Sequence, residues 1–163
     1  MRFALLGNSG SGKSTYAKVL AAKHGIAILD LDLDQIAWEP DAPTTLRSPQ
    51  AAAEDVTAFC TSHEGWVVEG CYADLVRATL PFEPQLEFLD PGEAQCLANC
   101  LDRPWEPSKY ASKAAQDENL EFLLTWVSAY YERDGDLSHQ VHSALFDEYT
   151  GPKRRWVDRP AVT

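Results

Sequence analysis

The chain has 163 residues, 45% of them hydrophobic and 10% aromatic, so it is long enough for a single folded domain over residues 1–163 and too apolar for a disordered segment. A formal net charge of −11 disfavours nucleic-acid binding, which depends mainly on Lys and Arg side chains that contact phosphates. The sequence lacks the run of roughly 20 apolar residues that a membrane helix needs, and it lacks a signal-peptide pattern, so we expect a cytoplasmic protein with reduced cysteines.

The first elements in chain order form a strand–helix–strand unit. The apolar spacing predicts a buried strand over residues 3–6, a helix over 13–23 with Tyr16, Val19 and Leu20 on one face, and a second strand over 26–31. Two strands joined by a helix in this way are typical of a parallel sheet.

The middle of the chain continues the alternation of helices and strands. Residues 39–50 are rich in Pro, Thr, Ser and Asp and are expected to form a loop, in which Ser48 caps a helix over 50–62. Further strands are predicted over 65–70 and 86–90.

The C-terminal part is predicted to be mostly helical. One helix is expected to begin near Pro91, and apolar spacing predicts further helices over 115–131 and 138–149, followed by a short strand over 155–157. The whole pattern predicts an α/β fold, with a parallel sheet covered on both faces and ligands at the carboxyl ends of the strands.

A phosphate-binding loop is the strongest functional signal. The motif G-x-x-x-x-G-K-[ST] is matched in full between the first predicted strand and helix, by Gly7, Asn8, Ser9, Gly10, Ser11, Gly12, Lys13 and Ser14, with Thr15 next in the helix. Glycines let such a loop turn its N–H groups toward phosphate oxygens. Lys13 is expected to reach the β- and γ-phosphates of ATP, and the Ser14 hydroxyl to bind Mg²⁺.

Carboxylates follow the predicted strands and are candidates for metal and acceptor binding. Asp32 and Asp34 are two residues apart, which places both on one side if the second strand persists that far. We expect Asp34 to orient the acceptor or act as its general base, and Asp32 or Glu69 to bind the magnesium directly or through water. Each could instead be a solvated loop residue. Asp90 is expected to cap the following helix.

Four other side chains near the strand ends have two interpretations each. Arg77, on an expected short helix, could bind an acceptor carboxylate or phosphate, or could form a surface salt bridge. Arg103 could reach the transferred phosphate or could be an ordinary helix-end cation. Trp38 and Tyr72 could stack on an aromatic acceptor, although aromatic residues in such places more often pack in the core.

Two further clusters have both a functional and a simpler interpretation. Cys96 and Cys100 with His139 and His142 give only a weak zinc signal, because the two pairs lie in separate predicted helices. The basic run at 153–155 could lie near the adenine, but a solvated tail is the simpler interpretation.

The phosphate loop, residues 31–38 and residues 66–72 together resemble the adenylate-kinase-like proteins often labelled DNA-topology-modulation proteins. More distantly, the chain is similar to shikimate kinase, whose Asp-x-Asp pattern corresponds to Asp32 and Asp34. The resemblance covers roughly residues 1–100. It implies a P-loop NTPase of the nucleoside-monophosphate-kinase type: a three-layer fold with a mostly parallel five-stranded sheet and a helical lid.

The resemblance also implies where an acceptor and a lid would lie. The lid is expected at residues 103–136, hereafter the lid segment, with cations at Arg103, Lys109 and Lys113. The acceptor pocket is expected near Asp34, Trp38, Glu69, Gly70, Tyr72 and Arg77. The expected activity is transfer of the γ-phosphoryl group of ATP to a small-molecule or nucleotide acceptor. The alternatives are an NTP hydrolase and an NTP-binding regulatory module.

Overall fold

The computed structural model describes residues 1–107 and 109–160, with the side chains of residues 42–44 left out. Within this range five parallel strands form one sheet in the order β2-β5-β1-β6-β7. The strands are β1 (Arg2–Gly7), β2 (Ala27–Asp30), β5 (Trp66–Gly70), β6 (Gln85–Leu89) and β7 (Lys153–Trp156). The predicted five-stranded parallel sheet is therefore confirmed.

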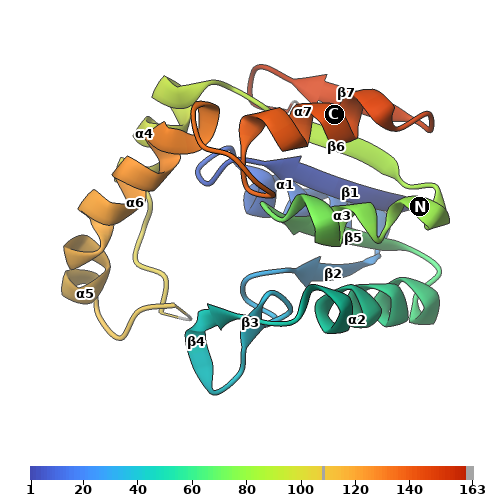
Figure 1. The fold of residues 1–163 in the computed structure, drawn as a ribbon, viewed down its shortest axis with the longest axis horizontal. Helices are drawn as coiled ribbons and strands as arrows, with labels where there is room; N and C mark the ends of the chain where they lie inside the picture. The colour runs from blue at the N-terminus through green and yellow to red at the C-terminus, as the bar shows by residue number, and fades with distance from the viewer. Residues whose placement is uncertain (108, 161–163) are drawn as a thin grey trace.

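Helices flank this sheet and extend beyond the carboxyl ends of its strands (Figure 1). They are α1 (Lys13–His24), α2 (Pro49–Ser62), α3 (Ala73–Arg77), α4 (Glu93–Leu101), α5 (Lys113–Glu118), α6 (Leu120–Ser128) and α7 (His139–Glu148), with single 3₁₀ turns η1 (Leu80–Phe82) and η2 (Ala129–Tyr131). No helix in the described ranges has both the length and the apolar composition needed to cross a membrane.

Alternate side chains of β1 divide the core into two layers. Leu5 packs with Tyr16 and Leu20 of α1 on one face of the sheet. Ala4 and Leu6 belong to the larger cluster on the other face, which α2, α3 and α7 complete. Since successive side chains of a strand point to opposite faces, a strand buried on both sides reads as a continuous apolar run, as the sequence here does. The three-layer arrangement agrees with the prediction.

The segment predicted as a loop over residues 39–50 contains a small antiparallel hairpin, so that prediction was wrong. β3 (Trp38–Glu39) pairs with β4 (Ala42–Leu46). A two-stranded ribbon leaves many N–H groups unpaired, and it therefore tolerates the prolines that suggested a loop. Ser48 precedes α2 as its N-cap residue, but its side chain makes no capping hydrogen bond.

The long helix predicted over 115–131 is interrupted. α5 ends and α6 begins around Asn119, whose Nδ2 donates to the Tyr110 hydroxyl at 2.9 Å. α7 begins as predicted, because Ser138 Oγ accepts a hydrogen bond from the backbone N of Val141 at 3.2 Å.

The lid segment lies beyond the carboxyl ends of the strands, with α5 and α6 set apart from both faces of the sheet (Figure 1). It is connected to the rest of the molecule where α6 packs on α4 through Cys96, Cys100 and Val127. The phosphate loop follows the carboxyl end of β1, so the fold brings the loop and the lid segment to the same end of the sheet.

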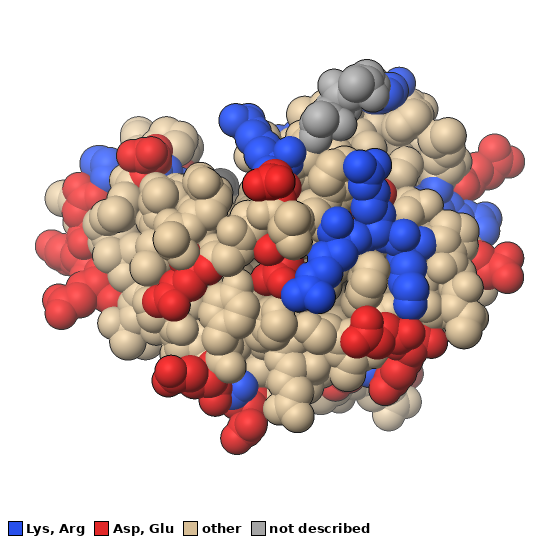
Figure 2. All heavy atoms as spheres, turned by 90° about the horizontal axis from the view of Figure 1, so that it is seen from above, with Lys and Arg blue, Asp and Glu red and all other residues tan. Residues whose placement is uncertain are grey.

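A basic run occupies the opposite side of the fold from α2. Residues 153–155 are exposed in the edge strand β7, where Figure 2 shows Lys and Arg side chains gathered. The run is therefore part of the sheet, and its interpretation as a solvated tail was wrong. Charged side chains on an edge strand disfavour edge-to-edge pairing with another sheet.

Candidate active site

The phosphate loop connects β1 to α1 and fits closely against α4. Gly10 and Gly12 have φ angles of 78° and 94°, in the left-handed region that favours glycine. A Cβ atom on Gly10 would lie 2.4 Å from the carbonyl oxygen of Cys96, so the loop can approach α4 only with glycine there. Ser9 to Thr15 line a cleft of about 830 Å³, whereas Gly7 and Asn8 are buried outside its lining.

Lys13 is the buried cation of this cleft. Its side chain is 6% exposed, and Nζ donates to the carbonyl oxygen of Asn8 at 2.8 Å. Burial lowers the pKa of Lys13, but attraction to Cys71, Glu69 and Asp32 outweighs this, so the net shift is upward. The ammonium group therefore stays charged at neutral pH.

Glu69 and Ser14 form the pair that best suits a magnesium ion. Glu69 is 3% exposed near the end of β5, and the Ser14 hydroxyl and the Asp30 carboxylate are close enough to influence its pKa. Burial raises the pKa of Glu69, and the nearby Lys13 acts in the opposite direction. Magnesium prefers oxygen ligands and usually keeps several waters or phosphate oxygens, so one hydroxyl and one carboxylate fit it.

The second strand does not persist to Asp32 and Asp34, so the condition under which they would share one side of a strand is not met. β2 ends at Asp30, and the chain then turns. Asp34 folds back, and its Oδ2 accepts from the backbone N of Asp30 at 2.8 Å. Asp32 lines the cleft, and its Oδ1 accepts from the Tyr72 hydroxyl and from Trp38 Nε1 at 3.2 Å.

Trp38 and Tyr72 thus contact each other and a candidate site residue. Their rings meet edge-to-face with centroids 6.5 Å apart. Tyr72 is only 7% exposed and Trp38 is half-buried. Their observed role is to pack at the edge of the core and to hold Asp32.

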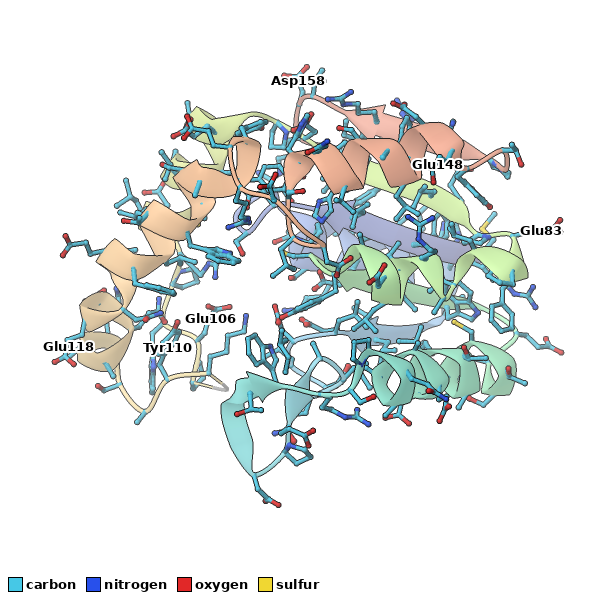
Figure 3. All side chains as sticks on the ribbon, viewed as in Figure 1. Glu83, Glu106, Tyr110, Glu118, Glu148 and Asp158 are labelled. Atoms are coloured by element: carbon cyan, nitrogen blue, oxygen red, sulfur yellow. The ribbon has the colours of Figure 1, made fainter. Side chains whose placement is uncertain are left out.

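The two candidate arginines have different surroundings. Arg77 lies on α3 as expected, but it pairs with Glu148 of α7 at 3.4 Å and does not line the cleft. Glu148 lies on the side of the molecule away from the lid segment (Figure 3). Arg103 lines the cleft and pairs with Glu106 at 3.3 Å. Of the two, only Arg103 is brought near the phosphate loop.

The lid cations are likewise divided. Lys109 lines the cleft and lies 4.0 Å from Glu106, which Figure 3 places on the connection between α4 and α5. Lys113 pairs with Asp117 on α5 and is outside the cleft lining.

Asp90 does not cap α4, so that prediction was wrong. The N-cap residue of α4 is Gly92, and Asp90 instead pairs with Arg155 of β7. The same carboxylate lies 3.2 Å from His139 Nε2 and accepts from the Tyr131 hydroxyl at 3.0 Å. Burial raises the pKa of Asp90, but these three partners together lower it by more, so the net shift is downward. The aspartate therefore ties β6 to three later segments of the chain.

The residues of the weak zinc signal lie in separate contacts. Cys96 and Cys100 are buried against Val127, while His142 lies between the Tyr130 hydroxyl and the carbonyl oxygen of Cys71, 2.8 Å from each. Among the described residues, no three His, Cys, Asp or Glu side chains are grouped to hold a metal ion.

Two residues near the phosphate loop were missed from the sequence. Asp30 lines the cleft beside Glu69, and the only hint was an acidic residue inside a predicted apolar strand. Cys71 also lines the cleft, and its Sγ is 3.8 Å from Ser9 Oγ. No sequence pattern marks Cys71, because its place depends on how β5 lies beside β1.

The comparisons with known proteins establish the fold. No family model matches the sequence, and no curated protein sequence matches it. Shikimate kinase from Aquifex aeolicus matches with a TM-score of 0.52 and 14% identity, over 98% of this chain and 88% of that one. A gluconokinase from Sinorhizobium meliloti matches with a TM-score of 0.52 and 17% identity, over 98% and 83%.

At these identities the similarity concerns the fold alone. The resemblance to shikimate kinase is confirmed at that level, whereas the resemblance to the DNA-topology-modulation proteins is not confirmed. The chain has the P-loop fold found in these small-molecule kinases.

Proposed function

We propose that the chain is an ATP-dependent phosphotransferase that passes the γ-phosphoryl group to a small hydroxyl-bearing or nucleotide acceptor. One observation carries the proposal. The buried Lys13 ammonium, the Ser14 hydroxyl and the Glu69 carboxylate converge beside the glycine-rich loop in a cleft of about 830 Å³. This combination suits a triphosphate with its metal ion.

Each residue of the loop would have a defined part. Backbone N–H groups of the loop and the N-terminus of α1 would bind phosphate oxygens. Lys13 would move from the Asn8 carbonyl to the β- and γ-phosphates. Magnesium, held by Ser14 and directly or through water by Glu69, would offset negative charge on the phosphates.

The acceptor would meet Asp32 rather than Asp34. Asp32 lines the cleft, and Tyr72 and Trp38 both donate to its Oδ1, so Oδ2 is left to orient an acceptor hydroxyl. Asp34 does not line the cleft, and its Oδ2 accepts from the backbone N of Asp30. Closure of the lid segment, with Arg103 and Lys109, would exclude water from the reaction.

The test is a screen for ADP release with nucleoside monophosphates, shikimate, gluconate and other small hydroxyl compounds. A kinase releases ADP only when its acceptor is present. A hydrolase would release ADP equally without any acceptor, and a regulatory module would bind ATP with almost no turnover. Either of these results would contradict the proposal.

Lys13→Ala is expected to lower the rate of ADP release by about a thousandfold or more, because no other Lys or Arg among the described residues is buried and could stabilise the transferred phosphoryl group in its place. Circular dichroism should show an unchanged fold. Lys153→Ala, which removes an exposed cation of β7, is the matched control and should keep the rate. Near-native turnover by the Lys13 variant would refute the assignment.

A further inference from the structure

The side chain of Asn8 ties the phosphate loop to the lid segment. Asn8 is 2% exposed, and its Nδ2 donates to the backbone carbonyl oxygen of Val127 at 3.0 Å. Val127 lies in α6 and is fully buried. A buried hydrogen bond thus joins two segments that are distant in the sequence.

This hydrogen bond lies at a helix end that needs donors. α6 ends at Ser128, where the last carbonyl groups of a helix are short of donors, and the N–H of the C-cap residue Ala129 is directed at the carbonyl oxygens of Thr125 and Val127. The neighbouring carbonyl of Trp126 accepts from Arg133 Nη1 at 2.8 Å. Asn8 Nδ2 supplies a further donor for the Val127 carbonyl, from the buried side of the phosphate loop.

The backbone of Asn8 contacts Lys13. Its carbonyl oxygen accepts from Lys13 Nζ at 2.8 Å, so one residue holds the ammonium through its main chain and the lid segment through its side chain. Asn8 Oδ1 is buried without a partner among the described residues. The side chain therefore holds α6 through its donor alone.

A second hydrogen bond connects the phosphate loop to α4. Asn99 Nδ2 of α4 donates to the carbonyl oxygen of Gly10 at 2.8 Å. α4 packs in turn on α6 through Cys96, Cys100 and Val127. A shift of the phosphate loop would therefore change its contacts with both α4 and α6.

We infer that Asn8 is a positioning residue that couples phosphate binding to the lid segment. When a triphosphate draws the Lys13 ammonium from the Asn8 carbonyl, the Asn8 side chain transmits the movement of the loop to the C-terminal end of α6. The inference rests on the proposed function, because Lys13 must bind the phosphates. It assigns a role to a loop position whose side chain the phosphate-binding motif leaves unspecified.

The test is hydrogen–deuterium exchange on the full chain, with and without Mg²⁺ and a non-hydrolysable ATP analogue. In the wild type, the analogue should slow amide exchange in both α1 and α6. The hydrogen bond to Val127 corresponds to about a fivefold change in rate, from a net contribution of about 1 kcal/mol. Because the hydrogen bond is already present without the analogue, the slowing expected in α6 is at most of this size.

Two variants test whether the Asn8 side chain acts as a hydrogen-bond donor or only fills space. Asn8→Asp keeps the size but presents an acceptor to the Val127 carbonyl, so the slowing in α6 should vanish while that in α1 remains. Asn8→Ala leaves a void without repulsion and should lose less of the α6 effect. In both variants kcat should fall more than KM changes. Thr125→Ala, at an exposed position of α6, is the control and should behave as the wild type.

The outcomes keep the two proposals apart. If the wild type does not bind the analogue, the proposed function fails, and the inference fails with it. If the analogue binds but α6 is slowed equally in Asn8→Asp, only the inference fails. It also fails if Asn8→Ala is more damaging to the α6 effect than Asn8→Asp, because the side chain would then merely fill space. Should Asn8→Asp not fold, unchanged slowing of α6 in Asn8→Ala would overturn it.

Discussion

Asp32 is the carboxylate whose surroundings best suit the proposed role of orienting an acceptor hydroxyl group. The Tyr72 hydroxyl and the Trp38 indole fix one of its oxygens, which limits its rotation. A fixed carboxylate can orient a hydroxyl group without first losing conformational freedom. Asp34, by contrast, serves the turn after β2.

We therefore expect Asp32→Asn to lower kcat by about a hundredfold or more, the usual contribution of a positioned acid or base. Asp34→Asn should keep kcat within about threefold, because an Asn side chain can still accept from the Asp30 backbone N. The measurement is acceptor-dependent ADP release, with any acceptor that the screen identifies. The opposite order of effects would return the acceptor role to Asp34.

Arg77 offers a test with a predicted lack of effect. Its partner Glu148 and its own side chain are both well exposed, so the ion pair should contribute well under about 1 kcal/mol to stability. Arg77→Ala should keep both kcat and the midpoint of urea unfolding nearly unchanged. A large loss of kcat would show that α3 moves to bring this arginine to the acceptor.

At the scale of elements, the contact between the phosphate loop and α4 decides which glycines are replaceable. Gly10 faces the Cys96 carbonyl, whereas a Cβ atom on Gly12 would meet nothing within 4 Å. Gly12 requires only its positive φ, which costs a non-glycine residue about 1–2 kcal/mol.

Gly10→Ala should therefore abolish binding of the ATP analogue, because the loop must leave α4. Gly12→Ala should lower the free energy of unfolding by about 1–2 kcal/mol and should keep measurable binding. Isothermal titration calorimetry and urea unfolding on the two variants would check this order. Equal damage from both would mean that backbone conformation alone controls the loop.

Local patterns were enough to predict the elements that make the phosphate site. The strand, the glycine loop and α1 follow each other directly, so their order in the sequence fixes their arrangement in space. The place of Asp34 was not predictable in this way, because it depends on β2 ending at Asp30. The pairing of Arg77 with Glu148 joins residues far apart in the sequence, and no local pattern carries it.

At the scale of the whole molecule, a buried histidine joins the end of β5 to α7. The carbonyl oxygen of Cys71 can only accept, so His142 Nε2 carries the proton and Nδ1 accepts from the Tyr130 hydroxyl. Burial, with a smaller effect from the positive charges of Lys13 and Arg133, lowers the pKa of His142 to about 4. The neutral ring is the form that fits the fold.

The sign of the pH effect follows from this shift. The unfolded chain takes up a proton near pH 6.5, but the folded chain does so only near pH 4, so stability is complete above pH 6.5 and is lost as the pH falls toward 4. The loss attributable to His142 is about 3 kcal/mol. Urea unfolding at several pH values should show a flatter dependence for His142→Gln than for the wild type. Parallel curves would exclude His142 as the source.

The strand order has a consequence for how the chain is made. β1 comes before every other strand in the sequence, yet it is the middle strand of the sheet, between β5 and β6. During synthesis β1 lacks at least one strand partner, and its apolar side chains are not fully covered, until both neighbouring strands have left the ribosome. β6 gains its outer partner only when β7 emerges. A nascent chain stalled before residue 153 would thus expose an unpaired backbone edge, and such an edge invites association with other chains.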